Sequence, residues 1–440
     1  MGTVGVIGCI LAFLLVIYLC YRDWSVYIAT FCGACVVMVF TQTNFVQALT
    51  TTYVNGIMVA IKGFFFMLMF GCIQSYLYRE SGAAYSIANF VMNHLLKDNQ
   101  SATKQNVISM SIILIIGTVL SLGGIIAGVV IVLMYPIALA VFERCDIPKR
   151  FILGMLGAGA YTFTLTLPGS PEVTNVAAMQ VLHTASTVAA IPGICGAIVE
   201  ILVILIVLNR LILRAKARGE HFQRHPLDPS YETDQNMPNF FLALIPLIVL
   251  FIAFNAFHAD IIVSLLISCI ASVILFRAYL PFDKCKKAIC DGATDSIPMT
   301  LTVAAICGFA QIMTQSDGFK ILLNTITGIQ LPAIFICWFV IALMCMLTGG
   351  SSTGQLIALP LIAPKLIKMG LNIEIIHRVS VFAATTLDSM PYSGSILMLL
   401  PMCHMKLKEI YPPMFVTTVL ATTCGTATVV FVCSVFPNLA

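Results

Sequence analysis

The chain has 440 residues, of which 60% are hydrophobic and only 10% are charged, and its formal net charge is +4. A soluble protein carries about 25% charged residues, and so few charges cannot cover a water-exposed surface of this size. The composition therefore excludes a soluble globular protein, and the small positive charge does not indicate a nucleic-acid partner.

The chain contains sixteen cysteines, and most of them lie inside apolar stretches. In such surroundings a thiol behaves as a small hydrophobic group. The Cys and His spacings do not suggest a metal site, so we predict neither a disulfide framework nor a metal centre.

The first half contains a series of apolar runs, and a membrane-spanning helix needs about 20 such residues. We predict spanning segments at residues 2–21, 24–41, 57–78, 151–180 and 186–213. The first run has no basic leader and no convincing cleavage site, so we expect it to be a retained helix. The run 106–143 is interrupted at residues 121–124, which predicts a re-entrant hairpin.

The stretch 214–238 is the one clearly polar segment between long apolar runs. It is too short to fold as a domain, so we interpret it as a linker between a first repeat (1–213) and a second repeat (239–440). Its cluster of basic residues places it in the cytoplasm by the positive-inside rule. Counting the crossings from this linker puts Lys320, Lys365, Lys368 and Arg378 on the outside, which departs in part from the positive-inside rule.

The second half repeats the pattern of the first. Apolar runs occur at residues 239–257, 260–277, 292–315, 374–404 and 412–436, and a second interrupted run, 331–369, breaks at 348–354. Matching short motifs recur at a nearly constant offset, as expected for an internal repeat. We therefore predict an all-α integral membrane protein with about ten crossings and two re-entrant hairpins, arranged as inverted repeats with discontinuous helices.

Four segments combine Gly or Pro with hydroxyl side chains and interrupt the apolar runs: the hairpin tips at 121–124 and 348–354, and the breaks at 167–172 and 387–394. Non-helical backbone is stable at membrane depth only where it is buried in protein or lines a wet cavity. Free amides at the start of a half-helix hold anions, and free carbonyls at its end hold cations. We therefore predict a substrate site formed by Ser121, Gly123, Gly124, Gly169, Ser170, Thr174, Asn175, Gly350, Ser351, Ser352, Thr353, Ser389, Tyr392 and Ser393.

A few ionisable residues lie inside the apolar runs. A carboxylate at the centre of a membrane helix costs about 2.5–3.5 kcal/mol on insertion scales, so its presence calls for a reason. Asp388 and Glu172 lie at the two breaks, and we expect them to be the cation-coupling groups. Glu200 is also embedded in an apolar run. It is either a further functional carboxyl or the structural partner of a Lys or Arg from another helix.

Residues 122–175 and 385–415 resemble the gluconate:proton symporter (gluconate permease) family of the ion-transporter superfamily, and the resemblance runs over most of the chain. It implies a proton-coupled importer of sugar acids or small hydroxy acids in the cell (inner or plasma) membrane, with inverted repeats and re-entrant hairpins, and a homodimer. This chain departs from the family pattern at Tyr392, Ser393 and Glu172, where the family has His, Asn and a neutral or amide residue. Because these residues lie at the predicted site, they leave open a substrate other than gluconate and a coupling ion other than the proton.

The main hypothesis is a secondary active transporter that imports a small organic acid anion by symport with a cation, a proton or alternatively sodium, and needs no cofactor. A sodium-coupled carboxylate or dicarboxylate carrier is the first alternative, and a passive anion channel is the second. A membrane enzyme is disfavoured, because the sequence has no zinc-protease, nucleophile-elbow or nucleotide-binding motif.

Overall fold

The computed structural model describes residues 2–22, 24–95, 102–228, 236–327, 331–391, 393, 396 and 403–439. Helices make up most of these residues, and no strand occurs among them. Six helices in the described part of the chain are long and apolar enough to cross a membrane, and six shorter apolar helices accompany them.

The helices of the first half follow the predicted apolar runs. Their bounds are α1 (Gly2–Tyr21), α2 (Val26–Thr41), α3 (Phe45–Gln47), the π-helical η1 (Ala48–Tyr53), α4 (Val54–Glu80), α5 (Ala83–Leu95), α6 (Ala102–Leu122), α7 (Ala127–Arg144), η2 (Lys149–Phe151), α8 (Ile152–Ala160), α9 (Phe163–Thr166), α10 (Val173–Leu182) and α11 (Ala190–Ala217).

The second half follows its apolar runs in the same way. Its elements are α12 (Phe240–Asn255), α13 (Ile261–Leu275), α14 (Phe282–Gln315), α15 (Asp317–Thr327), α16 (Ala333–Thr348), α17 (Ser351–Lys368), α18 (Ile373–Ala384), α20 (Leu407–Phe415), the π-helical η3 (Val416–Leu420), α21 (Ala421–Val435) and η4 (Pro437–Leu439).

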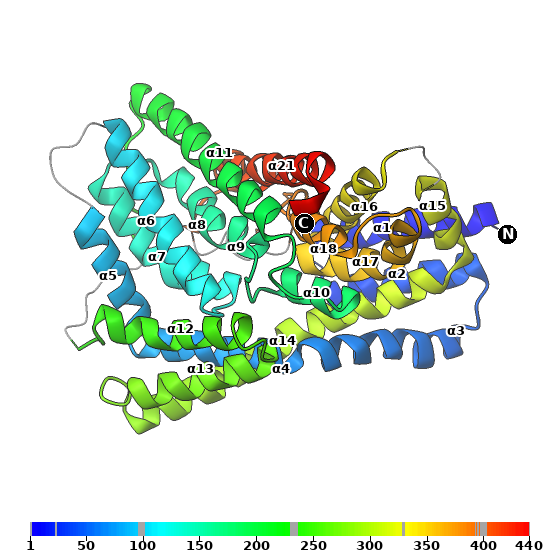
Figure 1. Ribbon diagram of the computed structural model, residues 1–440, viewed down its shortest axis with the longest axis horizontal. Helices are drawn as coiled ribbons and strands as arrows, with labels where there is room; N and C mark the ends of the chain where they lie inside the picture. Colours follow the sequence, from blue (N-terminus) through cyan, green and yellow to red (C-terminus); the bar gives the residue numbers. More distant parts are fainter. Residues whose placement is uncertain are drawn as a thin grey trace.

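The long helices α4 and α14 run side by side through the molecule (Figure 1). Their backbones approach closely at two glycines. Gly56 of α4 faces the carbonyl of Cys307, and a Cβ on Gly292 of α14 would lie 2.8 Å from the Cα of Ile73. A side chain at either position would push the helices apart, so the pair is held at close distance at two separate points.

Equivalent helices make equivalent contacts in the two halves. The α1–α2 pair packs on α14 and α15 of the other half, and the α12–α13 pair packs on α4 and α5. In both halves, an interrupted pair of apolar helices (α6–α7 or α16–α17) then packs on the short helix that follows it (α8 or α18).

The segments that follow the two breaks cross to the opposite half. Helix α10 packs on α17 and α18, and α20 packs on α8. Accordingly, Ala178 and Leu182 belong to the hydrophobic core that contains α16–α18, whereas Ile410 and Met414 belong to the core that contains α6–α8. The two halves are therefore interleaved rather than merely adjacent.

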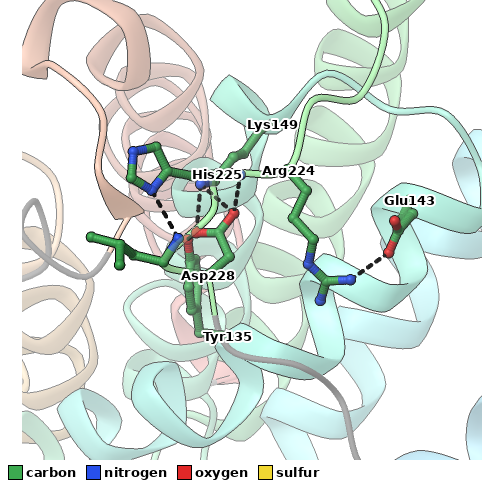
Figure 2. Close-up of polar contacts among 7 residues, drawn as sticks. Tyr135, Glu143, Lys149, Arg224, His225 and Asp228 are labelled. Atoms are coloured by element: carbon green, nitrogen blue, oxygen red, sulfur yellow. Dashed lines mark hydrogen bonds and ion pairs between the residues drawn. The ribbon is translucent and has the colours of Figure 1, made fainter.

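The start of the polar linker is fastened to the first half. Asp228 lies between Lys149 and Tyr135, with its oxygens 2.6 Å from Lys149 Nζ and 3.0 Å from the Tyr135 hydroxyl (Figure 2). The His225 amide donates a third contact at 2.8 Å. The side chains of Lys149 and Asp228 are 7% and 0% exposed.

These contacts decide the charge state of Asp228. Burial alone would raise the pKa of this carboxyl, but the hydrogen bonds from Lys149, the His225 amide and Tyr135 outweigh it and hold the pKa below its usual range. We call the Lys149–Asp228–Tyr135 contact the linker clasp. Two other ion pairs, Arg150–Glu220 and Arg224–Glu143, lie beside it and are more exposed than the Lys149–Asp228 pair.

Candidate functional site

The first break spans residues 161–172, between α8 and α10, and its backbone is held by its own polar side chains. Ser170 Oγ donates to the Thr164 carbonyl at 2.7 Å, and Thr174 Oγ1 donates to that of Leu165 at 2.9 Å. Asn175 Nδ2 donates to the carbonyls of Leu167 and Ser170 at 3.1 and 3.0 Å. Three of the predicted site residues therefore support the break from within.

Gly169 takes the left-handed conformation that favours glycine, with a φ of +82°. Its carbonyl accepts a hydrogen bond from Asn255 Nδ2 at 2.9 Å, and a Cβ added to it would lie 2.9 Å from Asn255 Oδ1. Asn255, at the end of α12, also accepts a hydrogen bond from Ser186 Oγ. Asn255, which was not selected from the sequence, links the first break to the second half.

His377 and Arg378 of α18 complete the support of the first break. His377 Nε2 lies 3.1 Å from Asn175 Oδ1, and its Nδ1 lies 2.6 Å from Thr184 Oγ1. The guanidinium of Arg378 donates to the carbonyls of Thr166, Ser186 and Val188 at 2.7–3.1 Å.

Arg378, one of the charges that the sequence places on the outside, lies buried within α18. Arg378 is 0% exposed, because the break and the following loop leave carbonyls that its five N–H groups can reach. Arg150, at the corresponding turn of the first half, instead forms a partly exposed ion pair with Glu220.

The second tip and the second break lie against each other. Ser393 Oγ donates to the Gly349 carbonyl at 2.9 Å, and Ser389 Oγ donates to Asp388 Oδ1 at 2.9 Å. The Ser351 side chain is also within interaction range of the Asp388 carboxyl. Thr353 closes the tip with a 3.0 Å hydrogen bond to the Gly350 carbonyl. Predicted site residues of this half therefore meet around Asp388.

Tyr161 connects these parts of the structure, and sequence reasoning did not select it. It directly follows α8 as its C-cap residue, and its hydroxyl lies near Gly128 in the first turn of α7. Its phenol group interacts electrostatically with both Glu172 and Asp388. The two carboxyls are each 7% exposed.

The remaining predicted residues differ in their surroundings. Gly123 and Gly124 of the first tip lie against Leu247, Leu250 and Leu265 of α12 and α13. Ser121 is 0% exposed, and Ser352 is half-buried at the start of α17. Tyr392 lies outside the described residues.

Buried polar atoms without partners are concentrated at the tips and breaks. In the described part of the chain, six buried side-chain oxygen atoms lack a hydrogen-bond partner, and four of them belong to Ser121, Thr164, Glu172 and Gln355. Such atoms are rare in folded proteins and call for a ligand, an ion or water. The other two belong to Glu200. No cluster of three or more His, Cys, Asp or Glu among the described residues could hold a metal ion.

A family model described as GntP family permease matches residues 3–436. The chain belongs to the GntP permease family. The resemblance noted in the sequence is thereby confirmed, and this GntP permease is a multi-pass membrane protein of a transporter family.

Two curated relatives are themselves described only as uncharacterized transporters. One, YxjC from Bacillus subtilis (strain 168), is 24% identical over 94% of this chain and 95% of its own length. The other, from Haemophilus influenzae, is 23% identical over 72% and 71%. This permease is also similar to the crystal structure of the Alcanivorax borkumensis YdaH transporter, reported to have an unusual topology. The TM-score is 0.57 at 14% identity over 90% of each chain, so the likeness concerns the fold alone.

Proposed function

We propose that this protein is a secondary active transporter that imports a small organic acid anion, such as a gluconate-like sugar acid or a hydroxy acid, together with a proton. The observation that carries the proposal is that the segments at the tips and breaks contain unpartnered buried oxygen atoms and the two buried carboxyls of Glu172 and Asp388. Polar groups left open in this way are what a bound polar solute would complete.

The proposed substrate site comprises the predicted residues at the two tips and two breaks, together with Tyr161, Thr164 and Gln355. Asp388 and Glu172 take up the coupling cation there. Sodium is the second candidate, because Ser389 and Ser351 place hydroxyl oxygens beside the Asp388 carboxyl, and hard cations prefer oxygen ligands.

The proposed architecture is a pair of inverted repeats with two re-entrant hairpins and about ten crossings. It is supported by the equivalent helix contacts in the two halves. The protein would lie in the cell (inner or plasma) membrane as a homodimer, with the linker in the cytoplasm because of its basic residues.

The test is uptake into proteoliposomes of labelled gluconate, hydroxybutyrate and dicarboxylates under an imposed proton or sodium gradient. We expect Asp388→Asn to lower concentrative uptake at least about tenfold while substrate exchange across the membrane continues, because exchange needs no net cation movement. A tenfold effect corresponds to about 1.4 kcal/mol.

The matched control is Asp317→Asn, because this carboxylate is 85% exposed and lies away from the breaks. It should transport as the unaltered protein does. Undiminished accumulation by Asp388→Asn, with the same pH dependence, would remove Asp388 from the coupling role. Uptake by the unaltered protein that never exceeds equilibrium would point to a channel.

A further inference from the structure

Glu200 is a buried carboxyl that the proposed site does not use. It lies in the middle of α11, is 0% exposed, and neither of its carboxyl oxygens has a hydrogen-bond partner. The pairing with a Lys or Arg that the sequence left open is not formed among the described residues. A charged carboxylate without any partner is strongly disfavoured in such surroundings.

Three helices meet in layers along the face of α11 that bears Glu200. Gly193 lies against Arg378 of α18, and a turn later Gly196 lies against Phe382 of α18 and Val429 of α21. Glu200 then lies against Gly425 of α21. Positions 193, 196 and 200 share one helix face because they are three and four residues apart. Figure 1 shows α11 and α21 side by side.

The packing of α11 on α21 leaves room for the Glu200 side chain. A Cβ added at Gly425 would lie 2.5 Å from Glu200 Oε1 and 2.9 Å from its Cδ. Any other residue at position 425 would therefore displace the carboxyl. The fit is close enough that the carboxyl occupies a defined position between the two helices.

Among the described residues, the basic group in the layers next to Glu200 does not reach its carboxyl. Arg378 lies two layers away, about 10 Å along α11 for seven residues at the helical rise, and Phe382 and Val429 lie between. The guanidinium of Arg378 is occupied by backbone carbonyls. Cys433, which interacts with Arg378, is the ionisable group of α21 in that same layer. Binding of a proton would therefore remove the negative charge of the Glu200 carboxylate, which these described groups leave uncompensated.

We propose that Glu200 is a proton-binding site inside the protein, separate from the proposed coupling site at Glu172 and Asp388. The bound proton keeps the carboxyl neutral and allows α11 and α21 to pack closely at Gly425. Loss of the proton would put an uncompensated charge between these helices, which join the two interleaved halves. Proton occupancy at Glu200 would therefore stabilise this arrangement of the molecule, whatever the transported solute.

The direct test is infrared spectroscopy of the purified full chain at neutral pH, which detects the carbonyl stretch of protonated carboxyl groups. We expect part of this band to disappear in Glu200→Gln and in Glu200→Ala. Asp388→Asn and Glu172→Gln, measured in parallel, should leave the Glu200 contribution in place. A full band in both Glu200 variants would overturn the proposal, and this readout is independent of transport.

A second test measures the fit at Gly425 through thermal stability. Gly425→Ala should lower the melting temperature by about 5 °C, as expected for overpacking a core. In the Glu200→Ala background the same substitution should cost less than about half of this, because the colliding carboxyl is gone. An equal loss in both backgrounds would show that Glu200 does not occupy this position and would contradict the proposal.

Discussion

At the scale of single residues, Arg378 is one of the side chains that hold the backbone around the first break. It makes four hydrogen bonds to three carbonyls that come from α9 and from the loop before α11. Without it the carbonyls of Thr166 and Val188 would lose these hydrogen bonds, whereas the Ser186 carbonyl would keep the one from the Gly169 amide. Arg378 thus stabilises the non-helical backbone of the first half from a helix of the second.

We predict that Arg378→Met lowers the free energy of unfolding by about 3 kcal/mol or more, because each unpaired buried carbonyl costs about 1–3 kcal/mol. Arg378→Lys should restore part of this, since the ammonium group still donates hydrogen bonds. Thermal unfolding in detergent measures both. The control is Arg218→Met at an exposed position, whose free energy of unfolding should stay within about 0.5 kcal/mol of that of the unaltered protein. An equal loss of stability in both Met variants would contradict the structural role of the Arg378 hydrogen bonds.

The sequence indicated some residues of the site and missed others for a physical reason. Asp388, Glu172 and the hydroxyls at the breaks were selected because carboxyls, Gly and Pro are conspicuous in apolar runs. His377, Arg378 and Asn255 were missed because their partners lie far away in the chain, such as Thr166, which is 212 residues from Arg378. The local sequence around these residues does not indicate which backbone carbonyls of a distant segment lack a hydrogen-bond partner.

At the scale of elements, the linker clasp joins a polar segment to the end of the first apolar helix pair. Its buried ion pair connects the linker to η2, and its third partner, Tyr135, comes from α7. The stacked rings of His225 and His404, 4.6 Å apart, extend the contact to the segment before α20. The linker up to Asp228 is therefore part of the folded body rather than a free tether.

The clasp predicts a dependence of stability on pH. The folded pKa of Asp228 lies below the ordinary value of 3.8, so its stabilising contribution is complete above that value and is lost as the pH falls through the lowered one. Asp228→Asn should cost about 1.5–3 kcal/mol at pH 7, typical of a charged hydrogen bond. The difference should shrink below about pH 4.

The measurement is thermal unfolding of both proteins from pH 7 to pH 3. Lys320→Met is the control, because the Lys320–Asp317 pair is solvent-exposed and contributes little. A difference between Asp228→Asn and the unaltered protein that stays constant over this range would contradict the assignment of the effect to the Asp228 charge.

Element boundaries were largely predictable, since long apolar runs bounded by polar residues become helices. The expected spans 2–21 and 260–277 match α1 and α13 to within a few residues. The length of α14 was not predicted, because its first turns, Phe282 to Asp291, are charged and lie outside the apolar run. An apolar-run criterion detects the buried part of a helix and not its polar extension.

At the scale of the whole molecule, the crossing of α10 and α20 into the opposite halves makes each half incomplete. The apolar faces that α17 and α8 present to these segments would be exposed if one half folded alone. The hydrophobic stabilisation of each core therefore requires both halves.

We predict that residues 1–228 and 236–440, expressed separately, do not give stable protein, whereas co-expression restores a complex and its uptake activity. The clasp should remain with the first fragment, since Lys149, Tyr135 and Asp228 all belong to it. Co-purification of the fragments and uptake measure this. Stable, monodisperse protein from either fragment alone would show that the cores are independent.

The close approach of α4 and α14 has a consequence for movement. Gly56 and Gly292 bring the two backbones together at positions far apart along the pair, so sliding or spreading would break contacts at both places at once. A carrier must shift its solute site relative to some stationary frame, and this pair is suited to be that frame. We expect any such shift to involve the segments around the breaks rather than α4 and α14.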